Sequence, residues 1–228
     1  YAIDHIFRLH SRFQKVHLIS QETEFDGFTK LTLEAPHIAI QSPGSYLLVN
    51  VSSSLFPTSV WEWEWHPFSV FNHHNLNKSQ FSVCMKSHSS GWTERVWRSF
   101  RENGEGSSMN VRVLGPFGCF PMDLKKHISD FSHVLLFSGG IGITPVLSVG
   151  QELLEMSDSL PKGLVVEVTF VSRGPDLFSV FSSEISELKS VGTVSKYITR
   201  TSRVESEQKK NQIIPHQQNE MDLTNIHG

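Results

Sequence analysis

Short alternating runs of apolar and polar residues fill the chain from residue 13 to residue 122. Alternation with a period of two over four to eight residues is typical of half-buried β-strands. It predicts strands at residues 28–33, 46–51, 61–71, 80–85 and 110–113. One helix is predicted at residues 91–102, because Trp92, Val96 and Phe100 recur at helical spacing. Residues 13–122 are therefore expected to form a small antiparallel β-barrel domain.

The period of the pattern changes after Pro121. Buried strands are predicted at residues 133–137 and 164–171, a third strand at 195–199, and helices at 144–156 and 176–189. Thr144 is the expected N-cap of the first helix, with Pro145 in its first turn. Strands that alternate with helices predict a parallel sheet, so residues 130–200 are expected to form an α/β domain. Residues 201–228 are polar and rich in Gln and Asn, which predicts a disordered or inserted segment.

Charge and cysteine content narrow the range of functions. The 228 residues carry a formal net charge of −3 and no long basic run, so no nucleic-acid partner is expected. Cys84 and Cys119 form no CxxC pair, which argues against a zinc framework, and no metal site is predicted. The uncharged stretch at residues 131–151 is long enough to cross a bilayer, but the glycines and Pro145 in its middle favour a strand, a turn and a helix.

Residues 139–145 read GGIGITP, after a predicted strand and at the start of a predicted helix. Glycines at such a position let the backbone approach a pyrophosphate, and the first turn of the helix supplies free N–H groups and partial positive charge. The candidate phosphate-binding residues are Gly139, Gly140, Gly142 and Thr144. Taken alone, this segment is equally well explained as a glycine-rich connection in an unrelated α/β domain.

Two further segments combine aromatic, hydroxyl and cationic residues. In the first, HPFS at residues 66–69, an aromatic ring beside a hydroxyl can pack on a flavin ring and hydrogen-bond it. In the second, Lys86 is followed by SGWT at residues 90–93, where a cation and a helix start can hold phosphate. Taken alone, the HPFS residues are better explained as ordinary core packing than as a flavin site. Lys86 and SGWT are likewise better explained as a solvated lysine and a helix-capping threonine than as a phosphate site.

Four segments follow one another in a defined order. They are HPFS at 66–69, the basic strand with SGWT at 90–93, GPFG at 115–118 and SGGIGITP at 138–145. Their order and approximate spacing resemble the family of flavin-dependent NADPH oxidases and ferric reductases. PGSY at 43–46 is similar to that family's PGQY turn, and residues 1–8 resemble the stretch after its last membrane helix. The resemblance covers roughly residues 1–200.

The resemblance implies a six-stranded antiparallel FAD-binding barrel at residues 13–122 and an incomplete NADPH-binding α/β domain at 130–200. It implies an electron-transfer module of a membrane flavocytochrome, which passes electrons from NADPH through FAD to haem and then to oxygen or ferric iron. Haem is expected only in the membrane part of the parent protein, which would be the partner of this chain. Residues 1–12 then represent a juxtamembrane helix end at the cytoplasmic face, and an ordinary amphipathic surface helix is the alternative.

The resemblance assigns cofactor contacts residue by residue. It assigns no catalytic residue, because hydride passes from cofactor to cofactor. FAD contacts are expected at His66, Pro67, Phe68, Ser69, Lys86, Gly91, Trp92 and Thr93. NADPH contacts are expected at Gly139, Gly140, Gly142, Thr144 and Arg173. Arg173 follows the second predicted strand of the α/β domain, where a cation can recognise a 2′-phosphate, and an exposed loop arginine is the alternative.

Two other functions are consistent with the sequence. The first is a soluble ferredoxin-reductase-like flavoenzyme, against which the basic residues near the N-terminus argue. The second is a cofactor-poor remnant with a binding role, because the Cys-Gly-Pro segment and terminal aromatic residue typical of the family do not occur before Gly228. We therefore expect an incomplete nicotinamide domain, and a chain that is soluble on its own.

Overall fold

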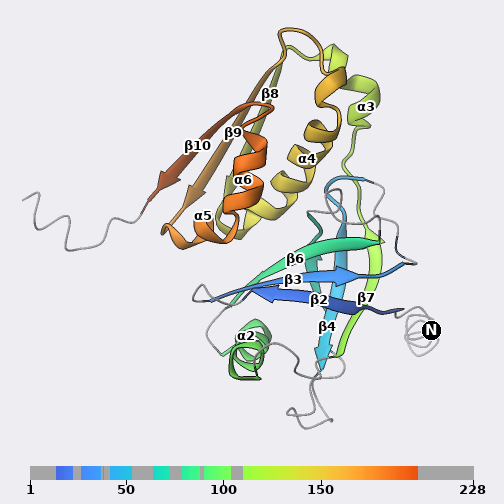
Figure 1. The fold of residues 1–228 in the computed structure, drawn as a ribbon, viewed down its shortest axis with the longest axis vertical. Helices are drawn as coiled ribbons and strands as arrows, with labels where there is room; N and C mark the ends of the chain where they lie inside the picture. Colours follow the sequence, from blue (N-terminus) through green and yellow to red (C-terminus); the bar gives the residue numbers. More distant parts are fainter. Residues whose placement is uncertain are drawn as a thin grey trace, which may run out of the picture.

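The computed structural model describes residues 14–22, 27–36, 38, 42–52, 64–71, 79–87, 90–103 and 110–199 (Figure 1). Within them, an antiparallel β-barrel is followed by an α/β unit with a parallel sheet, which confirms the predicted fold class. The predicted helix end at residues 1–12 and the predicted disordered or inserted segment at 201–228 lie outside the described residues. No helix in the described ranges combines the length and the apolar character that crossing a bilayer requires.

Two antiparallel sheets form the barrel. The first contains, in spatial order, β1 (Gln14–Lys15), β7 (Asn110–Phe117), β4 (Tyr46–Ser52) and β5 (His66–Ser69). The second contains β2 (His17–Glu22), β3 (Phe28–Glu34) and β6 (Gln80–Lys86). An isolated bridge between Phe71 and Ser82 connects the end of the β5 segment to β6. Helix α2 (Trp92–Asn103) contributes Trp92, Val96 and Phe100 to the barrel core, as their helical spacing predicted.

The observed barrel strands differ from the predicted ones in their bounds, and one strand at the edge of a sheet was not predicted. The strand predicted at residues 61–71 is represented by β5, and residues 61–63 lie outside the described part of the chain. Strand β2 was not predicted, because it is an edge strand whose residues are mostly exposed and alternate poorly. Strand β7 continues past the predicted end at residue 113, as far as Phe117.

Three parallel strands in the order β10-β9-β8 form the sheet of the α/β unit. They are β8 (His133–Gly139), β9 (Val165–Ser172) and β10 (Thr193–Ile198). The helical segments are α3 (Leu124–His127), η2 (Ile128–Asp130), η3 (Gly140–Gly142), α4 (Ile143–Glu155), η4 (Ser157–Ser159), α5 (Asp176–Val180) and α6 (Ser182–Leu188). The single helix predicted at residues 176–189 is thus two helices, separated at Phe181.

Two predictions about the α/β unit are wrong. Thr144 is not an N-cap, because η3 continues directly into α4 and the Thr144 hydroxyl donates a hydrogen bond to the Ile141 carbonyl at 3.1 Å. Strand β8 is not buried on both faces, because the side chains of Leu135 and Phe137 are 70% and 71% exposed. Helices α4 and α6 lie on the same side of the sheet, so alternate residues of β8 point away from them (Figure 1).

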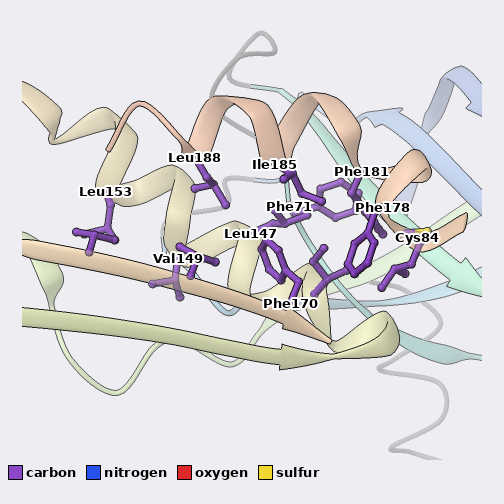
Figure 2. Close-up of a cluster of buried hydrophobic side chains, with 14 of the residues drawn as sticks. Phe71, Cys84, Leu147, Val149, Leu153, Phe170, Phe178, Phe181, Ile185 and Leu188 are labelled. Carbon is purple, nitrogen blue, oxygen red and sulfur yellow. The ribbon is translucent and has the colours of Figure 1, made fainter. Parts of the chain in front are cut away.

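The barrel and the α/β unit share a buried surface (Figure 2). Strands β3 and β6 direct one face into the barrel core, with Leu31 and Val83. Their other face carries Phe28 and Cys84, which belong to the apolar cluster of the α/β unit. Because both faces of β3 and β6 are covered, these two strands form a wall that belongs to both parts of the molecule. This wall places the carboxyl end of the parallel sheet next to the barrel (Figure 1).

Candidate cofactor-binding site

The glycine turn after β8 leaves room for a ligand beside its backbone. Gly140 has a φ of +55°, which a residue with a side chain adopts at a cost. Apart from chain neighbours, no atom of the described residues lies within 4 Å of the position that a Cβ would take on Gly139, Gly140 or Gly142. The turn leads into the 13-residue helix α4, whose N-terminus carries partial positive charge. A pyrophosphate fits these observations, because it needs close backbone approach and N–H donors.

Ser138 lies directly before this turn, and the sequence analysis did not select it. Its side chain is buried, and its hydroxyl is without a hydrogen-bond partner among the described residues. A buried hydroxyl that lacks a partner is unfavourable, because it has lost its hydrogen bonds to water. Ser138 is therefore a candidate to hydrogen-bond a ligand at the turn, and the signal for it is the unsatisfied hydroxyl, which only the structure reveals.

Arg173 lies directly after β9, one strand away from the glycine turn. In open α/β sheets, ligands bind outside the carboxyl ends of the strands, and both the turn and Arg173 lie at that edge. The arginine is exposed and forms no ion pair with the described residues. Its position is compatible with a nucleotide that binds along the edge from β8 to β9. The turn and Arg173 thus lie on one edge of the sheet.

The register of β5 against β4 separates the HPFS residues onto two faces. His66 and Phe68 pair with Val49 and Leu47, so they share the face that contains the barrel core. Phe68 is half-buried and packs against that core. Ser69 pairs instead with Tyr46, which is 37% exposed, so these two hydroxyl-bearing residues lie together on the outer face. Pro67, between His66 and Phe68 in the strand, is exposed.

Trp92, at the start of α2, joins the HPFS strand to the SGWT segment. Its ring is buried and stacks on the His66 ring, with centroids 4.5 Å apart and an interplanar angle of 26°. The Phe68 ring lies 6.1 Å from it at a similar angle. The structure thus brings together two segments that the sequence separates. Trp92 supports the two rings of β5 from the interior of the barrel, with Gly91 and Thr93 half-buried beside it.

A charged cluster next to His66 was missed by the sequence analysis. One carboxylate oxygen of Glu64, Oε2, lies 3.4 Å from His66 Nε2 and 3.6 Å from Arg95 Nη2. Arg95 also donates a hydrogen bond to the Ser90 carbonyl, at the start of α2. The cluster is partly exposed and combines a cation with a helix N-terminus, so it can hold a phosphate group. Glu64 and Arg95 are far apart in the sequence, so they form no local motif from which the cluster could be predicted.

Lys86 lies at the end of β6, close to the same helix start. Its Nζ lies 5.7 Å from the centre of the Phe28 ring. The next residue, Ser87, donates a hydrogen bond to Glu94 in the first turn of α2, and this bond, with a second from Arg98, lowers the pKa of the Glu94 carboxyl below its usual value. The bond between Ser87 and Glu94 fixes the end of β6 beside α2. Lys86 is therefore near the SGWT segment.

The two candidate halves of the site both adjoin β6. The glycine turn η3 packs against β6 from the α/β unit, and β5 lies beside β6 in the barrel. No group of three or more His, Cys, Asp or Glu side chains in the described part of the chain is arranged to hold a metal ion.

Two family models match the chain. Residues 12–120 match the FAD-binding domain model, and residues 131–227 match the model of the ferric reductase NAD binding domain. Solved structures share the fold at low sequence identity. A ferredoxin NADP+ reductase from Neisseria gonorrhoeae with bound FAD and NADP has a TM-score of 0.60 at 13% identity, covering 89% of this chain and 78% of its own. Phthalate dioxygenase reductase has a TM-score of 0.60 at 21% identity, covering 86% of this chain and 55% of its own.

Curated relatives extend the comparison to membrane reductases. Ferric reduction oxidase 4 of Arabidopsis thaliana is 32% identical over 130 residues, which are 55% of this chain and 18% of the relative. Ferric/cupric reductase transmembrane component 2 of Saccharomyces cerevisiae is 27% identical over 182 residues, 79% of this chain and 24% of the relative. The chain spans about a fifth of the length of such relatives. With the two domain models matched in order over most of its length, the chain carries an FAD-binding domain followed by a ferric reductase NAD-binding domain.

Proposed function

We propose that this chain is the electron-transfer module of a membrane reductase, which takes electrons from NADPH and passes them through FAD to haem in another part of the parent protein. The observation that carries the proposal is the packing of the glycine turn against β6, the strand that also contacts the HPFS strand β5. This placement puts a pyrophosphate-binding turn and an aromatic strand at the same boundary. The names of the relatives favour ferric iron over oxygen as the terminal acceptor.

The α/β unit supplies the nicotinamide side of the proposed site. Gly139, Gly140 and Gly142 admit the pyrophosphate, and the N-terminus of α4 supplies N–H donors to it. Thr144 supports the turn through its hydrogen bond to the Ile141 carbonyl. Arg173 binds a 2′-phosphate at the adjacent strand end, which makes NADPH the preferred nucleotide.

The barrel supplies the flavin side. When bound, FAD accepts a hydride from the nicotinamide and passes the electrons on singly, a chemistry that belongs to the cofactor. Ser69 and Tyr46 present hydroxyl groups on the outer face of the sheet, and His66 is supported from behind by Trp92. Lys86 and Arg95 place positive charge near the start of α2, where the pyrophosphate of FAD can bind. The remaining proposed contacts belong to the same two segments: Pro67 and Phe68 to HPFS, and Gly91 and Thr93 to SGWT.

The partner in this proposal is the membrane haem domain of the same parent protein. Since the relatives include transmembrane reductase components, we place the module at the cytoplasmic face of the membrane, where NADPH is available. Haem belongs to the membrane part in this proposal, and His5 and His10 of this chain are not assigned as its ligands.

Purification of the full chain in the presence of FAD tests the proposal. We expect a yellow protein with a flavin absorbance band at about 450 nm. This band should disappear when NADPH is added in the absence of oxygen. A folded but colourless protein would refute the assignment and favour a remnant with a binding role. A yellow protein that NADPH does not bleach would restrict the function to flavin binding. If NADPH does reduce the flavin, addition of the parent membrane part should permit reduction of its haem.

A further inference from the structure

One ion pair crosses the boundary between the barrel and the α/β unit. Lys30 Nζ, on β3, lies 2.7 Å from Glu184 Oε1, on α6, and the two side chains are 8% and 2% exposed. The other carboxylate oxygen of Glu184 accepts a hydrogen bond from the Ser183 hydroxyl at 2.9 Å. A second carboxylate, Glu22, lies 3.7 Å from Lys30 Nζ at the half-exposed edge of the barrel. Lys30 is therefore a buried cation whose nearest counter-charge belongs to the other part of the molecule.

Lys30 pairs with Cys84 across β3 and β6, so the ion pair lies beside the apolar cluster that the two parts share. Phe28, Cys84 and Phe181 belong to this cluster, in which Figure 2 labels Cys84 and Phe181. Apolar contact holds surfaces together but is non-directional, so it permits several similar orientations. A short charge-assisted hydrogen bond is directional, and a buried charge that loses its partner is strongly unfavourable. The ion pair therefore discriminates between orientations that the apolar cluster would accept.

We propose that Lys30 and Glu184 are positioning residues, which fix the orientation of the α/β unit on the barrel and thereby hold the glycine turn in place relative to β5. The first part concerns docking alone, and the second part rests on the proposed function. The pair is well placed for this role, because β3 is the neighbour of β6 and the glycine turn packs against β6. Hydride transfer requires reacting atoms about 3–3.5 Å apart, so a small rotation of one unit would slow it.

The variant K30M/E184L separates positioning from stability. Replacing a buried ion pair by apolar residues of similar volume commonly leaves stability unchanged or increased. We therefore expect an unfolding midpoint close to that of the wild type, together with looser docking. The matched control is K126M/D123N, which removes an exposed pair with a distance of 2.9 Å inside the α/β unit. The control should change neither stability nor docking.

The two native cysteines report on docking without any cofactor. Cys84 is buried in the shared cluster, and Cys119 is exposed. With excess thiol reagent, wild type and control should label Cys119 quickly and Cys84 slowly, whereas K30M/E184L should label Cys84 at least about tenfold faster through local opening. Burial is the main cause of the raised pKa of Cys84, while Lys30 lowers that pKa and Glu184 raises it, so removing both charges has opposing effects. Labelling of Cys84 at the wild-type rate would overturn the docking claim.

Flavin reduction tests the second part. In the full chain loaded with FAD, K30M/E184L should keep the wild-type flavin content but be reduced by saturating NADPH about tenfold more slowly, with a weaker charge-transfer absorbance. Reduction at the wild-type rate would overturn the positioning role. If NADPH fails to reduce the wild type, the proposed function fails, and thiol labelling still decides the docking claim. If K30M/E184L does not fold, Glu184→Gln, which keeps the shape of the side chain, is measured instead with the same expected and contradicting results.

Discussion

The ring of Phe71 meets the ring of Phe181 edge-on, with centroids 5.4 Å apart and planes inclined at 68°. Phe71 follows the HPFS strand of the barrel, and Phe181 separates α5 from α6 in the α/β unit. Both side chains are fully buried. Edge-to-face aromatic pairs are more stabilising than their buried area alone implies. This contact therefore links the flavin side of the proposed site directly to the helices that cover the parallel sheet.

Replacing Phe181 with Ala should lower the free energy of unfolding by about 3–5 kcal/mol, because it removes a fully buried ring and leaves a cavity at the shared surface. Urea unfolding followed by fluorescence and by circular dichroism would measure the change. Phe131→Ala is the control, because Phe131 is 41% exposed and its ring contributes far less. Equal losses in the two variants would contradict the assigned role of Phe181.

Gly140→Ala should weaken NADPH binding by about tenfold or more, because the new methyl group occupies the open space beside the turn. Gly163→Ala is a matched control. Gly163 also has a positive φ, +91°, and open space where a Cβ would lie, but it is in the connection between η4 and β9. Both variants carry a similar backbone cost of about 1 kcal/mol. Titration calorimetry with NADP+ would measure binding, and equal weakening in both would refute a local role.

Arg173→Ala should reduce the preference for NADPH over NADH by about 10–100-fold, because a charge-assisted hydrogen bond to the 2′-phosphate contributes about 1.5–3 kcal/mol. Flavin reduction rates with each nucleotide would give the ratio. Lys189→Ala, at the exposed end of α6, removes a positive charge elsewhere in the same unit. The assignment would be wrong if the NADH rate fell as much as the NADPH rate.

His66→Ala should raise the dissociation constant for FAD by about tenfold, because it removes the ring that stacks on Trp92 and its contact with Glu64. His127→Ala is the control. His127 also contacts a carboxylate, Asp130, at 3.2 Å, but lies in α3 of the α/β unit. Flavin fluorescence during dialysis would follow release. Unchanged retention in His66→Ala would remove His66 from the flavin site.

Cys84 should make the stability of the chain fall at alkaline pH. Burial raises the pKa of its thiol far above the ordinary value. The unfolded chain then loses this proton above about pH 8.5 while the folded chain keeps it, so the free energy of unfolding falls by about 1.4 kcal/mol per pH unit. This contribution is fully present below the unfolded pKa. Unfolding at several pH values should show a shallower alkaline slope for Cys84→Ala, and Cys119→Ser should keep the wild-type slope.

The apolar alternation predicted much of the barrel, because most of its strands have one face in a single core. Leu31, Leu33 and Phe81 illustrate this, since their positions follow the period of two and they are buried. The same reasoning could not predict the burial of Lys30, because its partner lies on α6, far along the chain. A polar residue in an alternating strand normally indicates the solvent face. Here that face is covered by the second unit.

The α/β unit shows where continuous apolar runs are ambiguous. Val134, Leu135, Leu136 and Phe137 are all apolar, so their pattern cannot tell which alternate side chains face the helices. Similarly, the apolar residues around Phe181 continue from α5 into α6 and conceal the break between them. In the candidate site, the motifs led to the glycine turn and to β5. Arg95 and Ser138 were missed because their significance comes from a neighbour in space and from an unsatisfied hydroxyl.

Strands β3 and β6 couple the folding of the barrel to the folding of the α/β unit. Because each strand lends one face to the barrel and the other to the helices, neither part has a complete apolar core without the other. Apolar contacts with the flavin-binding half therefore contribute to the stability of the nucleotide-binding edge. A destabilising substitution in either half should therefore lower the stability of both, and the two halves should unfold in a single cooperative transition. The affinities for the two cofactors should then change in the same direction.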